Sequence, residues 1–455
     1  MMATLCAVLA VSLLAGCNGK KNTASVGATG EVVRDLGGME IVIGNWWGDY
    51  DVNTFKPATA DDEKILAWRT EIQKKYNFTM TEKNIGGWGE IQQIASTSIM
   101  AGSPAASVFI LATDWAMSLY TQGLLYPVSD LPSVDFSSTT PVEWNQNVRE
   151  AFTAPNGKTY AWAVGYNLGG GVYWNKRLFE EAGLDKDLPY NLQKSGEWTW
   201  DAYMALCKRL TRDTNSDGII DVYGLAADGG ILDYAVSSNN ARFVDKDVNG
   251  RFFNSSTSSG FLQALQYVYS FKGEGVLMMA PPQSNWDWFM SAFHDGQVAM
   301  RVAAQYVSGD LRDMQDDWGF VVFPRGPGAT TYRYHVGENI QAVPVTFSAE
   351  EADNIMFAYS LWTTNPNPGG PDAWKESMYP SYRDARAIDE TIQLMHEDGH
   401  SMFDYGYLIP GIERGDISWH MWSDGDDPRD AMQPAQLIES VSQSWSATID
   451  LVNPK

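Results

Sequence analysis

The sequence has only three cysteines in 455 residues: Cys6, Cys17 and Cys207. So few cysteines cannot build a disulfide framework, and their spacing is not that of a zinc site. Positive charge is also scarce, since 32 Lys and Arg stand against 56 Asp and Glu and leave a formal net charge of −24. This balance argues against binding to nucleic acid or to an anionic membrane surface, because both require basic patches.

Two catalytic signatures are absent as well. The chain has no GxxxxGK[ST] phosphate loop and no Gly-x-Ser-x-Gly elbow, which argues against a P-loop enzyme and an α/β-hydrolase. Carboxylates are abundant, so counting alone leaves open a glycosidase pair of acids. Tryptophan (18) and tyrosine (21) are plentiful. That surplus suits a groove that stacks sugar rings, because aromatic faces offer large area at little rotamer cost.

The first segment, 1–17, is predicted to be a signal peptide. Its uncharged run Ala3 to Gly16 is too short to span a bilayer and fits a signal-peptide core. The run closes with Leu14-Ala-Gly-Cys17, which resembles the lipobox of bacterial lipoproteins and implies lipidation of Cys17. No Lys or Arg precedes the run, and a plain signal peptide with an incidental cysteine is the alternative. Segment 18–38, rich in Gly, Ser, Thr and Ala, is predicted to be a flexible tether.

The stretch Gly171 to Gly224 carries the clearest structural signals of the chain, and we call it the organising stretch. Gly171-Val-Tyr-Trp174 predicts a buried strand. A helix is predicted from Arg177, ending at Gly183, because glycine accepts the positive φ of a helix end. Thr199 is predicted to cap the helix Trp200–Thr211. Cys207 falls within this helical pattern, where a free thiol behaves as a small buried apolar residue.

Four pieces of this stretch carry a resemblance to a known family. They are Tyr173-Trp-Asn-Lys, Leu178-Phe-Glu-Glu-Ala-Gly-Leu, Trp198-Thr-Trp-Asp, and Asp213-Thr-Asn-Ser-Asp-Gly followed by Tyr223-Gly-Leu. In this order and spacing they resemble the family 1 extracellular solute-binding proteins of ABC importers, a group that includes maltose-binding protein. The resemblance implies a monomeric α/β protein with the two-lobed, periplasmic-binding-protein-like fold (type II). It also implies a ligand cleft between two lobes joined by three crossovers. The predicted lobes are 39–163 plus 340–381, and 164–339 plus 382–455.

In the first lobe, ligand contacts are expected where strands end. Trp46, Trp47 and Asp49 follow the strand Met39–Gly44, and Asp114 and Trp115 follow the strand Ser107–Ala112. In open α/β sheets the ligand crevice lies outside the carboxyl ends of the strands. Trp88, in the glycine-rich loop that opens the next helix, is a further candidate. A core position is the alternative for one of the first two tryptophans and for Trp88, and a helix N-cap is the alternative for Asp114.

In the second lobe and the crossovers, the candidate ligand contacts are chosen from the resemblance. It implies that Gly169, Gly170 and Gly171 allow close backbone approach, and that an aromatic residue at Tyr306 stacks on the sugar. The ligand candidates in this half are Tyr166, Asn167, Tyr234, Gln305, Tyr306, Glu338, Asn339 and Trp422.

The loop Asp213 to Asp221 has the alternating oxygen spacing of a calcium loop. Its candidate ligands are Asp213, Asn215, Asp217, Asp221 and the carbonyl of Ile219. Glycine at the sixth position permits the sharp turn, but the twelfth position is Gly224 instead of the usual bidentate Glu. A structural Ca²⁺ and a plain Asx-rich turn therefore both stay open, and no cofactor is required.

The function expected from the resemblance is capture of a sugar, in particular an oligosaccharide, outside the cytoplasmic membrane. Delivery to an ABC import permease would follow, with the membrane reached only through the lipid anchor on Cys17, or with the protein free in a periplasm. The chain is expected not to be an enzyme. A glycan-active enzyme, and a module that presents ligand to a surface sensor, are the two alternatives.

Overall fold

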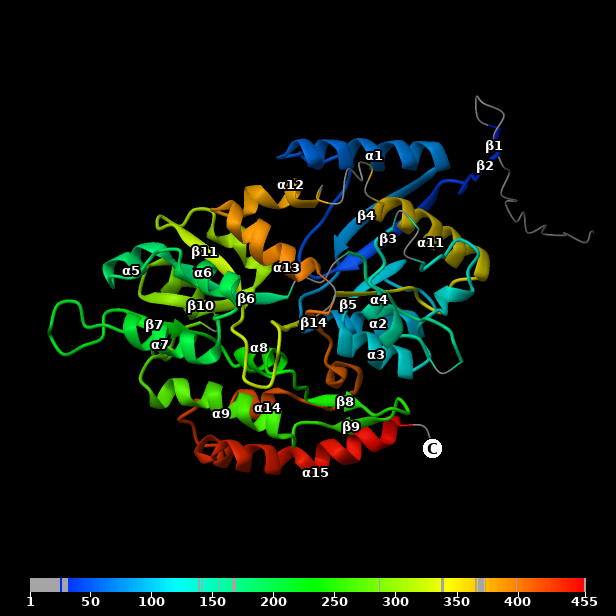
Figure 1. Ribbon diagram of the computed structural model, residues 1–455. Coiled ribbons are helices and arrows are strands. Elements are labelled where there is room, and N and C mark those ends of the chain that lie inside the picture. The colour runs from blue at the N-terminus through cyan, green and yellow to red at the C-terminus, as the bar shows by residue number, and fades with distance from the viewer. Residues whose placement is uncertain are drawn as a thin grey trace, which may run out of the picture.

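The structure is a computed structural model that describes residues 25–26 and 32–453, except 138–139, 141, 155, 166–168, 286, 337–338, 365, 367–371, 373 and 398. Two four-stranded sheets form its centre, each in its own lobe (Figure 1). Within the described ranges, none of the helices combines the length and apolar character that crossing a membrane requires.

The first-lobe sheet has the strand order β13-β5-β3-β4. β3 (Met39–Asn45) runs parallel to β4 (Phe78–Asn84) and to β5 (Val108–Ala112), and β13 (Asn339–Ala342) returns antiparallel to β5. β5 reads Val-Phe-Ile-Leu-Ala and is almost entirely buried, as expected for a strand covered by helices on both faces. Helices α1 (Ala60–Tyr76) and α11 (Ala349–Thr363) cover one face, and α2 (Ile91–Met100) and α3 (Thr113–Thr121) lie on the other (Figure 1).

The second-lobe sheet has the order β11-β6-β10-β7. β6 (Gly170–Asn175) is antiparallel to β10 (Val298–Ala304) and to β11 (Trp318–Val322), and β10 is parallel to β7 (Tyr223–Ala226). The helices of this lobe are α5 (Lys176–Glu181), α6 (Leu188–Ser195), α7 (Trp200–Leu210), α8 (Ile231–Ser238), α9 (Ser259–Gly273), α10 (Trp288–His294), α14 (Gly415–Ser418) and α15 (Pro434–Val452).

The remaining elements are short. They are β1 (Ser25–Val26), β2 (Val32–Val33), β8 (Val244–Lys246), β9 (Phe252–Asn254), β12 (Tyr334–His335), β14 (Ser401–Met402), α4 (Gln146–Ala151), α12 (Trp374–Met378), α13 (Gln393–His396), the π-helical turn η4 (Ala387–Ile392), and the 3₁₀ turns η1 (Val128–Asp130), η2 (Gln305–Leu311), η3 (Tyr379–Ser381), η5 (Tyr405–Leu408) and η6 (Pro428–Ala431).

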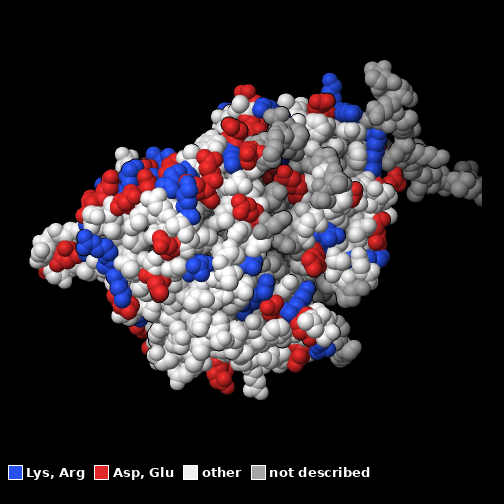
Figure 2. Space-filling view, in the orientation of Figure 1, with Lys and Arg blue, Asp and Glu red and all other residues white. Residues whose placement is uncertain are grey.

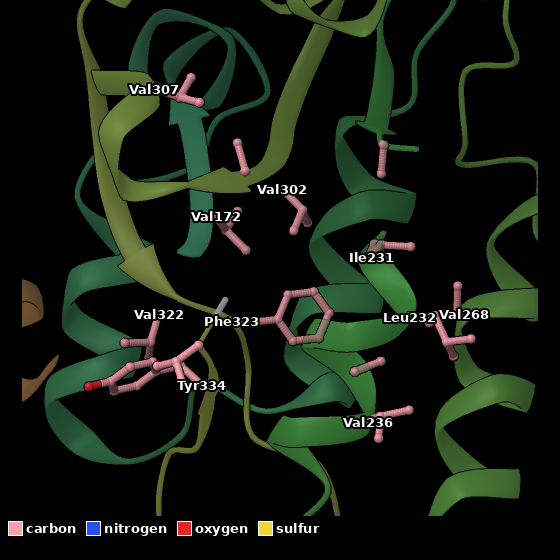
Figure 3. Packing of buried hydrophobic residues seen from close by; sticks show 14 of the residues in the cluster. Val172, Ile231, Leu232, Val236, Val268, Val302, Val307, Val322, Phe323 and Tyr334 are labelled. Carbon is pink, nitrogen blue, oxygen red and sulfur yellow. The ribbon is translucent and has the colours of Figure 1, made fainter. Parts of the chain in front are cut away.

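Local predictions in the organising stretch are confirmed. α5 is capped by the Asn175 side chain, and Gly183 just beyond its end has φ +72°. Thr199 caps α7 by accepting the backbone N–H of Ala202. Cys207 is fully buried and free, and burial raises the pKa of its thiol. The core of this lobe packs Val172 and other side chains of the sheet against α8, with the Phe323 ring between them (Figure 3).

The chain passes between the lobes along the edge of the first sheet. Trp162 exchanges backbone hydrogen bonds with Gln341 before the chain enters β6, and the return passage leads into β13. After α11, Trp374 of α12 stacks on His396 at 3.7 Å between ring centroids, and α12 contacts η4, which packs on β11. This part of the predicted first-lobe segment 340–381 therefore lies beside the second lobe.

The glycines that begin β6 are required by close packing. A Cβ added at Gly171 would overlap the Val321 carbonyl, and one added at Gly170 would overlap the Ala303 carbonyl and the Tyr234 hydroxyl. The expectation of close backbone approach at this crossover is therefore confirmed. Because backbone atoms cannot move aside, we expect Gly171→Ala to lower the free energy of unfolding by about 1–3 kcal/mol or more.

Urea unfolding measures this change, and Gly273→Ala is the matched control. Gly273 ends α9, has ordinary φ and has no atom within 4 Å of an added Cβ, so its replacement should be neutral or slightly stabilising. Equal effects at the two positions would contradict the steric account.

Charged side chains on the face seen in Figure 2 are intermixed, with Lys and Arg interspersed among Asp and Glu over α5 and α6. No continuous basic patch is visible on this face of the described chain, which agrees with the argument from net charge.

Candidate functional site

Four tryptophans gather at the carboxyl ends of the first-lobe strands. Trp46 makes edge contacts with Trp47, Trp88 and Trp115, at centroid distances of 4.8, 5.1 and 5.8 Å. The ring centroids of Trp88 and Trp115 lie 4.4 Å apart. We call these four residues the tryptophan cluster. The cluster forms because β3, β4 and β5 are parallel, so that residues following each strand meet at one edge.

A local turn presents part of the cluster to solvent. Asn45, the last residue of β3, is fully buried, and its side-chain oxygen accepts the backbone N–H groups of Trp47 and Gly48, both at 3.0 Å. Trp47 and Trp88 are 52% and 58% exposed, while Trp46 and Trp115 are half-buried. Such a group of exposed rings at one sheet edge is a surface that can bury against a flat apolar face of a ligand.

Asp114 lies beside this cluster, in the first turn of α3. Its side chain is exposed, yet the pKa of its carboxyl is raised, mainly by desolvation and further by Glu413. Arg414 acts in the opposite direction. Glu413 and Arg414 belong to the second lobe, and α3 also contacts η5. Asp114 therefore lies within electrostatic reach of second-lobe charges. The capping alternative is not met, because Ala112 occupies the N-cap position.

Arg414 is held in a dense polar network opposite Asp114. It pairs with Asp233 and with Asp404 (3.2 Å), and its guanidinium lies 3.4 Å from the centroid of the Tyr407 ring. The Tyr407 hydroxyl contacts Nε2 of His335 at 2.9 Å, and burial lowers the pKa of His335 to about 3. These contacts fix the position of the positive charge that faces the first lobe.

Two further first-lobe candidates lie at the same edge. Asp49 is exposed and accepts the backbone N–H of Asn84 at 2.8 Å, which ties the end of β4 to the loop after β3. Asn339 is exposed and pairs with Ala112 at the end of β5. Both positions are compatible with ligand contact, and Asp49 has an additional structural role.

The second-lobe candidates lie where β10 and β7 end. Tyr306 is 75% exposed directly after β10. Gln305 is half-buried, and its side-chain oxygen accepts the Tyr382 hydroxyl at 3.0 Å. Tyr234 on α8 is half-buried, and the pKa of its hydroxyl is raised by burial and by Asp228. The structure thus presents Tyr306 to solvent and gives Gln305 a supporting contact within the lobe.

The expectation for Trp422 is wrong. Trp422 is buried in the second-lobe core, where its indole N–H donates to the Val268 carbonyl at 3.1 Å. The acidic sequence around it suggested a loop at the rim, but α9 covers the ring. Its neighbour Trp419 is 77% exposed instead. The candidates Cys17, Tyr166, Asn167 and Glu338 lie outside the described residues.

Asp228 and Arg301 are site neighbours that the sequence reasoning missed. Asp228 follows β7, is exposed, and has a pKa raised mainly by desolvation, with Asp233 adding to the effect. Arg301 is buried within β10. The available signal was the position of Arg301 itself, since an arginine inside a strand of Val, Ala and Met is unusual.

The acidic loop after α7 folds through its own side chains. Asp213 accepts the N–H groups of Ser216 and Gly218, and Asp221 accepts that of Thr214. Gly218 has φ +88°, as the sharp turn requires. Among the described residues no group of three His, Cys, Asp or Glu side chains is placed to hold a metal. Calcium binding at this loop therefore stays a prediction, which unfolding temperatures with and without Ca²⁺ would test.

The sequence also contains a His-Glu-x-x-His spacing, at His396, Glu397 and His400. On a continuous helix this spacing places two imidazoles on one face as zinc ligands. Here α13 ends at His396, and Glu397 already has extended backbone. His396 stacks on Trp374, whereas Nδ1 of His400 lies 2.8 Å from the Tyr332 carbonyl. The spacing therefore does not form the helical zinc motif.

A comparison with protein-family models identifies the family of this chain. Residues 67–359 match the model of the bacterial extracellular solute-binding proteins. The chain belongs to this family. Membership places the protein outside the cytoplasm and confirms the predicted resemblance. A search of curated protein sequences found no match.

Solved structures show the same two-lobed fold. An ABC substrate-binding protein of Listeria monocytogenes in complex with cycloalternan has a TM-score of 0.63 at 16% identity, covering 91% of this chain and 99% of the other. UgpB of Mycobacterium tuberculosis, in complex with glycerophosphocholine, has 0.64 at 17%, covering 91% and 100%. The maltotriose-binding protein of Thermus thermophilus, bound to maltotriose, has 0.57 at 16%, covering 90% and 99%. At these identities the likeness establishes the fold.

Proposed function

We propose that this solute-binding protein captures an oligosaccharide between its lobes and delivers it to an ABC import permease. The tryptophan cluster carries this proposal. Sugar rings have apolar faces of C–H groups and edges of hydroxyls, so they bury well on aromatic side chains. Proteins of the same fold bind cycloalternan, maltotriose and mannotriose, and their ligands support the sugar class.

Polar groups from both lobes complete the proposed site. Asp114 and Asp49 offer carboxylate oxygens beside the cluster, and Tyr306 presents a ring from the second lobe. A carboxylate can accept hydrogen bonds from two sugar hydroxyls, and such charge-assisted bonds are stronger than neutral ones. The ligand is thus held by stacking on one lobe and by contacts that the other lobe adds.

Closure of the lobes is the proposed signal to the permease. A ligand shifts an open–closed equilibrium only if it binds one state better. The closed state makes contacts from both lobes to the sugar, so the sugar favours it. The glycine-rich crossover at Gly169 to Gly171 and the contact between α3 and η5 support a hinge and facing surfaces next to this site.

The proposed location is the outer face of the bacterial cell membrane. Cys17 would carry the lipid, and 18–38 would form the tether to the folded lobes. The ligand would be bound without being changed, and the folded protein would act as a monomer. These points rest on the lipobox-like sequence and on the family.

A panel experiment tests the proposal. Thermal unfolding of the soluble protein would be recorded against neutral and acidic oligosaccharides, followed by chromatography of each recovered sugar. A ligand present at 100 times its Kd adds about 2.7 kcal/mol to the free energy of unfolding. We expect a raised Tm with the sugar recovered intact. Consumption of the sugar would indicate an enzyme, and no shift with any sugar would refute the carbohydrate class.

A further inference from the structure

Arg301 occupies an unusual place for a charged residue. It lies in β10 between Met300 and Val302, pairs in register with Tyr173 of β6 and Ala226 of β7, and is only 1% exposed. Taking a guanidinium out of water is strongly unfavourable unless the charge is paired and hydrogen-bonded. A partner for Arg301 is therefore expected nearby.

Asp310 and Asp228 are within electrostatic reach of the Arg301 charge, but two of its nitrogens form no hydrogen bond with the described residues. Nε and Nη2 of Arg301 are buried and have no hydrogen-bond partner among the described residues. The guanidinium also lies 5.4 Å from the centroid of the Phe289 ring. Each unmade bond of a buried donor destabilises the folded protein, and a charged group is destabilised more than a neutral one.

The two unpaired nitrogens form one edge of the guanidinium, and other arginines show what that edge binds. Arg177 donates through Nε and Nη2 to the two oxygens of Asp316, both at 2.8 Å. Arg386 donates in the same way to Glu390, at 3.0 and 2.9 Å. This two-pronged geometry matches a carboxylate. At Arg301 the same two atoms, Nε and Nη2, are the ones without a partner among the described residues.

Arg301 lies next to the second-lobe half of the ligand site. Its charge offsets a small part of the rise in the pKa of Asp228 and of Tyr234, so both groups are within electrostatic reach. The Tyr173 hydroxyl, on the neighbouring strand, donates to the Gln305 carbonyl at 2.8 Å, immediately before Tyr306. Arg301 is therefore close to the segments that follow β7 and β10, which carry Tyr234 and Tyr306.

We propose that the ligand is an acidic oligosaccharide containing a uronic acid, and that the sugar carboxylate binds the Nε–Nη2 edge of Arg301. The inference rests on the proposed function and names its substrate class. Because the edge is buried, the carboxylate reaches it through a local side-chain movement at the end of β10. The ligand then supplies the hydrogen-bond partner that these two nitrogens lack among the described residues, while the tryptophan cluster stacks the sugar rings.

Matched pairs of sugars test the substrate class. Uronic-acid oligosaccharides from pectin, alginate and glucuronoxylan would be compared by calorimetry with the same oligosaccharides after reduction of their carboxyl groups. We expect one acidic member to bind about 10- to 100-fold more tightly than its reduced counterpart, the range for hydrogen bonds to a charged group. Equal or tighter binding of the neutral member would overturn the inference but leave the proposed function standing. Binding of no sugar would overturn both.

Variants of Arg301 separate ligand recognition from a structural role. Arg301→Met keeps the volume and removes the charge, and Arg301→Lys keeps the charge but cannot form the two-pronged contact. We expect both to lose the preference for the acidic sugar. The unliganded Arg301→Met protein should have a Tm equal to or above that of the wild type, because an unpaired buried charge is removed.

The matched control is Arg177→Met, which breaks an arginine–carboxylate pair on the surface of the same lobe. It should leave the acidic preference intact. A marked fall in Tm for Arg301→Met with the preference unchanged would show that a chain group such as Asp228 pairs with Arg301, and would overturn the inference.

Discussion

Replacing Trp88 by alanine is expected to weaken oligosaccharide binding by about 30- to 700-fold while leaving the protein folded. A buried tryptophan at the centre of a binding surface contributes about 2–4 kcal/mol, and each 1.4 kcal/mol is about tenfold in Kd. In the free protein Trp88 is 58% exposed, so its loss costs little stability. Calorimetric titration gives the Kd, and urea unfolding gives the free energy of unfolding.

Phe253→Ala is the matched control for this change. Phe253 is a 45% exposed aromatic residue on the β8–β9 hairpin of the second lobe, far from the tryptophan cluster in the sequence. We expect its replacement to leave the Kd unchanged. Unaltered binding by Trp88→Ala, or equal losses in both variants, would show that the tryptophan cluster is not the ligand surface.

Asp114→Asn is expected to weaken binding by about 10- to 100-fold, the range for hydrogen bonds to a charged group, and at the same time to stabilise the unliganded protein. The folded-state pKa of Asp114 is raised, chiefly by desolvation. An ionised Asp114 therefore disfavours folding, and its removal relieves that cost at neutral pH. Opposite signs in binding and stability are typical of a residue placed for function.

The pH dependence follows from the same shift. Because the folded pKa lies above the unfolded value, the wild type loses stability relative to Asp114→Asn as pH rises through the two pKa values. Below both values the carboxyl is protonated in either state and the difference should vanish. Urea unfolding between acidic and neutral pH measures it. A wild type more stable than the variant at neutral pH would contradict the desolvated position of Asp114.

The first-lobe half of the site was predictable because it depends on local order. Buried strands are recognisable as apolar runs, and parallel strands bring their carboxyl ends to one edge. Trp46, Trp47, Trp88 and Trp115 each follow such a run or the loop after it. Their ring centroids lie 4.4–5.8 Å apart because the parallel strands bring the following residues to one edge.

The second-lobe half was less predictable because it depends on contacts distant in sequence. Trp422 lies among acidic residues that suggest a loop, and only its bond to Val268 of α9 reveals a core position. Arg301 lies within the apolar pattern of a strand, which does not mark it as a site residue. Only the structure shows that its Nε and Nη2 atoms are buried without a hydrogen-bond partner among the described residues. In the sequence Asp228 resembles an ordinary turn residue. Its charged neighbours Asp233 and Arg301, which both affect its pKa, are known only from the structure.

Small-angle X-ray scattering of the soluble protein, with and without the tightest-binding oligosaccharide, tests the central claim most directly. If the sugar is held between the tryptophan cluster and the second lobe, saturation should reduce the radius of gyration, because closed lobes make contacts that open lobes cannot. Trp88→Ala at the same sugar concentration should stay at the unliganded value. Tight binding with no reduction in the wild type would contradict capture by closure of the lobes.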